Sequence, residues 1–216
     1  MQPVPLSNHR HKICIICEGD EEYEYISRLI NLAVWDGTYE IIPRNAHGES
    51  KIPPLYTNLY QNDRYELVLV FCDTDKAPHK HYNQVKSKIN EFHGESSESL
   101  LASEVIIFAN PCSMQIILSH FGDVSLTKQG KKTNADVIER LTSVIGYDAH
   151  LDQIKAVCNQ VTRSNYLKMK QRVALLDKPD TKPASTNFIR FLQWFESDDP
   201  KWIREKQAIL DNSKFC

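Results

Sequence analysis

The run Glu66-Leu-Val-Leu-Val-Phe-Cys-Asp-Thr-Asp75 decides the fold class of this sequence. Its apolar part is continuous and lacks the alternation of a half-exposed strand, so it predicts a strand that is buried on both faces. Strands of this kind occur in parallel sheets that helices cover on both sides. Asp73 and Asp75 follow the apolar part directly, which places two carboxylates at the carboxyl end of the predicted strand.

A second buried strand is predicted at residues 13–17, where the sequence reads ICIIC. Glu18 ends this strand, and the apolar stripe that begins after Asp20 predicts a helix with an acidic start. Shorter apolar runs at 39–42 and 105–109 predict two more strands, with helices between them. Strand and helix therefore alternate along the first half of the chain, which predicts an α/β fold with a mostly parallel sheet.

The character of the sequence changes after Gly122. Amphipathic stretches predict further helices there, and no strong strand signal is present. These helices are expected over residues 134–145, 151–161, 165–176, 185–195 and 202–210. We therefore expect three parts, a mobile leader (1–12), an α/β core (13–121) and a C-terminal helical appendage (122–216).

The composition is that of an ordinary globular protein. The 216 residues carry a formal net charge of −2, so any binding of nucleic acid needs a local basic patch. No apolar run is long enough to cross a membrane, and the first residues lack the apolar segment of a signal peptide. Cys14 and Cys17 form a C-x-x-C without a second such pair, so we expect structural thiols in a cytoplasmic protein.

Carboxylates follow both of the strongest predicted strands. The carboxyl ends of parallel strands meet at one edge of a sheet, where ligands bind. Glu18 and Glu22 lie one helical turn apart, so both can face the same space as Asp73 and Asp75. Oxygen ligands suit Mg²⁺ or Mn²⁺, and four carboxylates at one place would repel each other without a cation. The sequence therefore predicts a divalent-metal site.

Acidic residues at these places also have a plainer interpretation. Carboxylates after a strand serve as helix caps or as solvated loop residues, and carboxylates at a helix start interact favourably with its positive end. This interpretation accounts for Glu21 and Glu24, which we expect to be solvated, and it remains an alternative for Glu22.

The segments around the carboxylates resemble motifs of TOPRIM domains. Residues 17–25, Cys-Glu-Gly-Asp-Glu-Glu-Tyr-Glu-Tyr, are similar to the E-G-x-x-E opening, and residues 73–75 resemble its D-x-D. Residues 110–121, NPCSMQIILSHF, resemble the N-P-C-x-E-x-W-x-x-x-H-F segment of the RloB-like branch. Residues 183–187, PASTN, are similar to the late P-S-T-N stretch of that branch, so the resemblance covers roughly residues 13–190.

This resemblance implies a Rossmann-like TOPRIM core and a Mg²⁺-dependent nuclease. Metal-binding positions of the related nucleases fall on Glu18, Glu22, Asp73 and Asp75. The resemblance makes Glu18, Asp73 and Asp75 the expected catalytic residues. Glu18 is also a candidate general base. RloB-like proteins are associated with bacterial antiphage and abortive-infection systems, often beside an ABC- or AAA-type ATPase. A nucleic acid substrate, DNA or RNA including tRNA, and such an ATPase partner are therefore expected.

Two departures from the family pattern affect this expectation. Met114 stands where the branch has glutamate, and a thioether is a poor ligand for Mg²⁺, which leaves one metal or two open. Glu21 replaces the usual threonine of the opening motif. The alternative is a catalytically degenerate regulatory or interaction subunit of an ATPase defence complex. A D-x-D nucleotide-sugar transferase would leave Glu18 without a role.

Basic and aromatic residues outside the acidic motifs are open to two interpretations. Lys128, Lys131 and Lys132 are candidate contacts to nucleic-acid phosphates, or a solvated loop. The aromatic residues around Trp194 and Trp202 are expected in a helical core or on a partner-binding face, and the appendage is expected to carry specificity. The sequence is also compatible with a homo-oligomer.

The histidines near the motifs are expected to be structural. His79 and His81 fit the surface of a helix start, and His120 fits a hydrogen-bonded core position. The sequence has no Walker A loop, G-x-S-x-G or H-E-x-x-H motif, which leaves ATP hydrolysis and those hydrolase classes without support.

Overall fold

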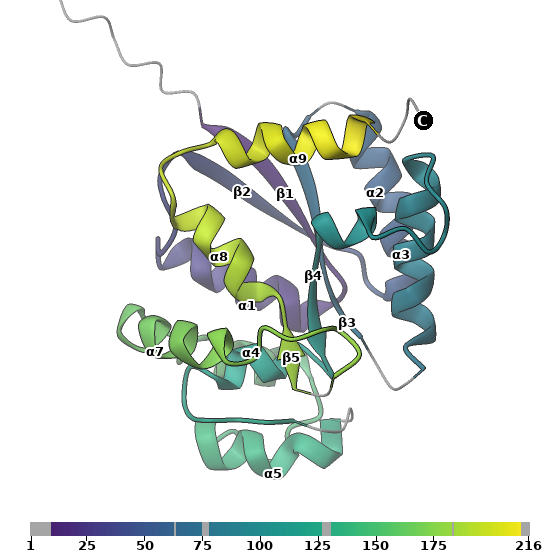
Figure 1. Cartoon of the computed structure of the whole chain (residues 1–216). Helices are drawn as coiled ribbons and strands as arrows, with labels where there is room; N and C mark the ends of the chain where they lie inside the picture. The colour runs from purple at the N-terminus through teal and green to yellow at the C-terminus, as the bar shows by residue number, and fades with distance from the viewer. Residues whose placement is uncertain (1–9, 63, 75–77, 127–130, 183, 213–216) are drawn as a thin grey trace, which may run out of the picture.

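A five-stranded sheet with the order β2-β1-β3-β4-β5 organises the molecule (Figure 1). The computed structural model describes residues 10–212 except 63, 75–77, 127–130 and 183, and it describes only the backbone of residues 131–133 and 212. The strands are β1 (His11–Cys17), β2 (Tyr39–Asn45), β3 (Leu67–Asp73), β4 (Ile106–Asn110) and β5 (Ser185–Thr186). β1 to β4 are parallel and β5 is antiparallel to β4, so the predicted α/β fold with a mostly parallel sheet is confirmed.

Helices cover both faces of this sheet. The chain passes from β1 through α1 (Asp20–Asn31) to β2, and then returns through α2 (Ile52–Gln61) to β3 and through α3 (Lys80–Phe92) to β4. Since crossovers between parallel strands are right-handed, the reversal of direction after β2 places α1 on one face and α2 and α3 on the other. Figure 1 shows α2 and α3 packed together, away from α1.

The apolar residues of the central strands β1 and β3 are buried because helices cover both faces of the sheet. Every residue from Ile13 to Cys17 is buried, and so is every residue from Leu67 to Cys72. β2 is an edge strand, which explains why it continues through Pro43, a residue that cannot donate a ladder hydrogen bond. β1 begins at His11, so the last two residues of the predicted leader belong to the sheet.

The later helices share one hydrophobic core with the sheet. They are α4 (Met114–Leu118), α5 (Lys131–Thr142), α6 (Leu151–Cys158), α7 (Arg163–Ala174), α8 (Phe188–Glu196) and α9 (Lys201–Asn212). Phe188 of α8 stacks on Phe71 of β3 and packs against Tyr25 of α1, with ring centroids 5.7 and 5.9 Å away. α4 ends at Leu118, and His120 and Phe121 bond to carbonyls three residues back, in 3₁₀-type turns.

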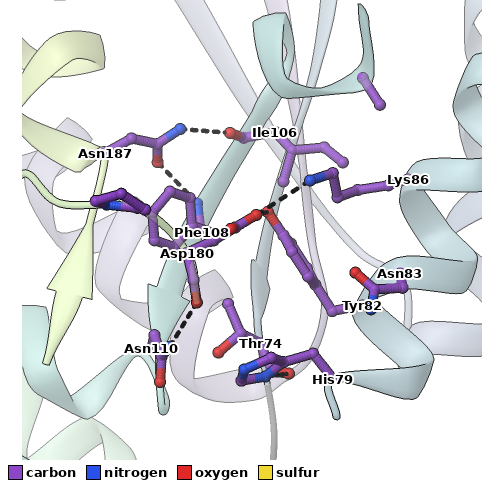
Figure 2. Close-up of polar contacts among 12 residues, drawn as sticks. Thr74, His79, Tyr82, Asn83, Lys86, Ile106, Phe108, Asn110, Asp180 and Asn187 are labelled. Atoms are coloured by element: carbon purple, nitrogen blue, oxygen red, sulfur yellow. Dashed lines mark hydrogen bonds and ion pairs between the residues drawn. The ribbon is translucent and has the colours of Figure 1, made fainter. Parts of the chain in front are cut away.

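The expectation of a wholly helical segment from residue 185 was wrong, because Ser185 and Thr186 form β5. Thr186 Oγ1 donates to the Phe108 carbonyl of β4. The Asn187 side chain continues this pairing, since its Oδ1 accepts the Phe108 N–H at 2.9 Å and its Nδ2 donates to the Ile106 carbonyl at 2.7 Å (Figure 2). The P-S-T-N stretch therefore closes the β4 edge of the sheet, and a two-residue strand is too short to give an apolar run.

The loop that precedes β5 contacts both α3 and the carboxyl end of β4. The Asp180 carboxylate accepts hydrogen bonds from Tyr82 Oη at 3.0 Å and Lys86 Nζ at 3.1 Å, both on α3. The Asp180 carbonyl accepts from Asn110 Nδ2 at 2.6 Å, at the carboxyl end of β4 (Figure 2). These contacts connect α3, β4 and the loop in one network.

The two ends of the parallel strands are covered by different helices. α9 crosses the amino ends, where Trp202 Nε1 donates to Tyr39 Oη at 2.9 Å and Gln207 Nε2 donates to the Glu66 carbonyl at 2.7 Å. Trp202 is buried in this contact and belongs to the core. Figure 1 shows α4 and α5 at the opposite, carboxyl ends. Among the described helices, none combines the length and apolar character needed to span a membrane.

Replacing Asn187 by alanine tests the closure of the β4 edge. The change leaves the Phe108 N–H and the Ile106 carbonyl buried without partners, so the free energy of unfolding should fall by about 1–3 kcal/mol. Urea denaturation measures it. The control is Arg190→Ala, on the same helix, which removes a partly exposed ion pair with Asp177 and should cost less than about 1 kcal/mol. Equal losses in the two variants would contradict the structural role of Asn187.

Candidate metal centre

Glu18 and Asp73 lie side by side at the carboxyl ends of β1 and β3. The pairing places Cys17 beside Phe71, and the next residues along both strands lead directly to the two acids. The Asp73 backbone N–H donates to Glu18 Oε2 at 3.0 Å. The predicted meeting of these two residues at one edge of the sheet is therefore confirmed.

Glu22 joins them from the first turn of α1. Gly19 is the N-cap of this helix, and its N–H donates to Glu22 Oε2 at 2.9 Å. This contact turns the Glu22 side chain back toward the end of β1, and only 4% of the residue is exposed. Glu22 is therefore a buried acid beside the other two, and not a solvated residue of a helix start.

Glu21 was expected to be solvated, and this expectation was wrong. Its Oε2 accepts from Ser113 Oγ at 3.1 Å, and its Oε1 accepts from Tyr147 Oη at 2.7 Å. The local sequence gave no signal for these contacts, because Tyr147 lies 126 residues away along the chain. The sequence offers one hint, since Glu21 stands where the opening motif of TOPRIM domains has threonine. Glu24, by contrast, is partly exposed and lies 3.7 Å from Lys155 Nζ.

These acids form one wall of a cavity of about 440 Å³. Apart from Gly19, the other lining residues come from α4, α5 and α6 and from the segments that precede α4 and α6. The lining residues are Glu18, Gly19, Asp20, Glu21, Glu22, Asp73, Cys112, Met114, Asn134, Ile138, Tyr147, Ala149 and Ile154. The cavity thus joins a charged wall from the amino-terminal half of the chain to a mostly apolar wall from later segments.

The acids repel one another in this enclosed place. Burial raises the pKa of Glu22 to about 7, with the charge of Glu21 adding to the effect. Burial, followed by the charges of Glu22, Glu18 and Glu21, raises the pKa of Asp73 well above its usual range. The hydrogen bond from the Ser113 N–H to Asp73 Oδ1, 2.7 Å long, opposes this shift in part. A bound cation would cancel the repulsion.

The chemistry of this donor set fits a hard divalent cation. The acids offer carboxylate oxygens, the ligands that Mg²⁺ and Mn²⁺ prefer. Within the described ranges, no three acidic, histidine or cysteine side chains stand as a complete ligand group. Asp75, the fourth predicted ligand, lies outside the described residues.

The lysines predicted to contact nucleic acid are near in sequence to Asn134 and Ile138, which line the cavity. Lys128 falls outside the described residues, and Lys131 and Lys132 begin α5 with side chains that are not described. Asn134 and Ile138 of the same helix line the cavity. α5 therefore contributes to the same cavity as the acids.

The histidines have the structural roles that the sequence predicts. His120 Nδ1 lies 2.9 Å from Asn165 Oδ1, and its Nε2 lies 3.0 Å from Tyr25 Oη. Burial lowers the pKa of His120 to about 4, so it is neutral at neutral pH. His79 is the N-cap of α3, and its ring contacts the Thr74 carbonyl, whereas His81 lies 3.4 Å from Glu49.

The described cysteines are buried thiols. They are Cys14, Cys17, Cys72, Cys112 and Cys158. Cys112 lines the cavity, but burial and the charges of Asp73 and Glu21 raise its pKa well above the usual range. Cys112 is therefore protonated at neutral pH and is no nucleophile there.

A solved structure shares this fold. The chain is similar to the C-terminal region of the Burkholderia pseudomallei OLD protein, with a TM-score of 0.51 over 91% of this chain and 98% of that chain. The sequence identity is 14%, so the likeness shows the fold alone, which agrees with a TOPRIM-like core. No protein-family model and no curated protein matches the sequence.

The raised pKa of Glu22 predicts a pH dependence of stability. The folded protein holds a proton that the unfolded chain releases near pH 4.5, so the free energy of unfolding falls as the pH rises from about 4.5 to about 7. A shift of this size corresponds to about 3 kcal/mol. Urea denaturation between pH 4.5 and pH 7, with a chelator present to remove metal ions, measures this change. In Glu22→Gln the free energy of unfolding should depend less on pH. A wild-type curve that is already flat would contradict the repulsion.

Proposed function

We propose that this chain is a Mg²⁺-dependent nuclease that hydrolyses phosphodiester bonds of DNA or RNA, including tRNA, in the bacterial cytoplasm. One observation carries the proposal, namely that Glu18, Glu22 and Asp73 come together from β1, α1 and β3 at the carboxyl edge of the sheet. The fold that it shares with the C-terminal region of an OLD protein supports the TOPRIM part of the proposal.

The acidic residues would perform separate tasks in this reaction. Glu22, Asp73 and Asp75 would hold the cation together with Glu18. The bound cation makes an attacking water more acidic and stabilises charge on the scissile phosphate. Glu18 would take the proton of this water, and the hydrogen bond from the Asp73 N–H to Glu18 Oε2 orients its carboxylate.

The biological setting follows from the RloB-like resemblance. The segments at residues 110–121 and 183–187 resemble motifs of a branch that is associated with antiphage defence and abortive infection, often beside an ABC- or AAA-type ATPase. We therefore infer that the chain works with such an ATPase. Co-purification of the chain with an ATPase encoded by a neighbouring gene would support this partnership.

A regulatory subunit without catalysis is the second candidate function. Met114 favours it, because this side chain lines the cavity where the RloB-like pattern has glutamate. Calorimetry with Mg²⁺ and Mn²⁺ separates the two candidates. Binding that weakens in Asp75→Ala supports the enzyme, whereas a lack of metal binding supports the regulatory subunit.

Conservative amide substitutions test the nuclease. In Asp73→Asn the new amide oxygen can still accept the hydrogen bond from the Ser113 N–H. In Glu18→Gln the new amide oxygen can still accept the hydrogen bond from the Asp73 N–H. Both variants should therefore keep the fold while they lose the charge. Cleavage of DNA and tRNA with Mg²⁺ should fall at least about a hundredfold in both variants. Asp123→Asn, at an exposed ion pair, should cleave like the wild type. Equal activity in all these proteins would refute the assignment.

Alanine substitutions of Lys128, Lys131 and Lys132 test the nucleic-acid contact. If these lysines bind phosphates, the affinity for an oligonucleotide should fall, and the slope of log affinity against log salt should decrease by about 1 for each lysine lost. Fluorescence anisotropy at several salt concentrations measures the slope. Calorimetric affinity for Mn²⁺ should stay as in the wild type. An unchanged salt slope would show that the segment is only a solvated surface.

A further inference from the structure

We propose that Glu21 is a further ligand of the divalent cation, and that Ser113 and Tyr147 hold its carboxylate in the ligand position. This inference rests on the proposed function, since it requires that the acidic wall binds a cation. It goes beyond the predicted ligands Glu18, Glu22, Asp73 and Asp75, because the sequence pattern assigned Glu21 to a solvated helix start.

Ser113 connects Glu21 to Asp73. Its backbone N–H donates to Asp73 Oδ1 at 2.7 Å, while its hydroxyl donates to Glu21 Oε2 at 3.1 Å. One fully buried residue therefore holds two carboxylates from different elements, the first turn of α1 and the end of β3. This arrangement brings the Glu21 carboxylate to the same end of the cavity as Asp73.

Tyr147 fixes the second oxygen of Glu21. Its hydroxyl donates to Glu21 Oε1 at 2.7 Å, and the tyrosine is 1% exposed. Neither Ser113 nor Tyr147 is charged, so the two donors orient the carboxylate without neutralising it. Glu21 lines the same cavity as Asp73 and Glu22.

Ligand chemistry favours a carboxylate in this position. Carboxylates that bind metals are themselves oriented by hydrogen bonds from neighbouring groups, as Glu21 is by Ser113 and Tyr147. Met114 lines the same cavity, and its thioether is too soft a donor for Mg²⁺. Glu21 therefore adds a hard oxygen donor to a cavity in which Met114 provides none.

A purely structural bridge is the alternative role of Glu21. In that case its two hydrogen bonds would only attach the segment around Tyr147 to α1. A bridge and a ligand differ in their response to substitution, because a bridge needs hydrogen-bond acceptors whereas a ligand needs charge at one definite distance. Variants that change one of these properties at a time separate the two roles.

Calorimetry with Mn²⁺ alone, at neutral pH, is the direct test. Glu21→Gln keeps an acceptor and loses the charge, whereas Glu21→Asp keeps the charge and loses the reach. Both should weaken Mn²⁺ binding at least about tenfold, and Tyr147→Phe should weaken it about tenfold through the lost orientation. Glu24→Gln, one helical turn further on α1 beside Lys155, is the matched control and should bind Mn²⁺ like the wild type.

Thermal unfolding gives a second readout that does not depend on activity. Because Glu21→Gln removes repulsion, its melting temperature without metal should equal or exceed that of the wild type, while the rise on adding Mn²⁺ should shrink. A melting temperature that falls without metal, together with a full Mn²⁺-induced rise, would show that Glu21 is only a bridge and would overturn the inference.

The outcomes distinguish this inference from the proposed function. Wild-type affinity in both Glu21 variants would overturn the role of Glu21 and leave the metal site intact. Wild-type affinity in Glu21→Asp alone would also overturn it, because charge without ligation would then suffice. A wild-type protein that binds no Mn²⁺ would overturn the proposed function and this inference together.

Discussion

The parallel pairing of β1 with β3 is the constraint on which the rest of the structure depends. It aligns Cys17 with Phe71, so the acids that follow the two strands emerge next to each other. The Asp73 N–H then bonds to Glu18, and α1 starts two residues after Glu18 and brings Glu21 and Glu22 to the same place. A shift of one residue in this pairing would reverse the faces of a strand and separate the acids. The buried apolar side chains of both strands prevent that shift.

The part of the architecture that follows from strong local patterns could be predicted from the sequence. Continuous apolar runs identified β1, β3 and β4, and the rule that parallel strands end at one edge placed Glu18 beside Asp73. β5 could not be predicted, since it exists only through pairing with β4 and has no apolar pattern of its own. Glu21 was misassigned for the same physical reason, because its environment is made by Ser113 and Tyr147, which are remote in the sequence.

The acidic wall lowers the stability of the fold in which it is embedded. Burial of Glu22 beside Glu21 and Asp73 opposes folding whenever these groups are ionised, and no local sequence preference would select that arrangement. Natural proteins break such rules mainly at functional sites, where the surrounding structure compensates. Here the compensation comes from the buried strands on one side and from α4, α5 and the Tyr147 segment on the other. The unfavourable charge is consistent with the proposed cation site, because a bound cation would offset it.

The late position of β5 also has a consequence for synthesis of the chain. Thr186 and its partner Phe108 are separated by 78 residues, so the ribosome translates β4 on the order of ten seconds before the segment that covers its edge. During that interval the nascent sheet presents an open edge of apolar strand, a template for pairing with other chains. The polar side chains of Thr186 and Asn187 end this exposure by bonding to backbone groups of Ile106 and Phe108. The pairing of residues 185–187 with β4 thus covers an edge at which the earlier part of the chain could otherwise pair with other chains.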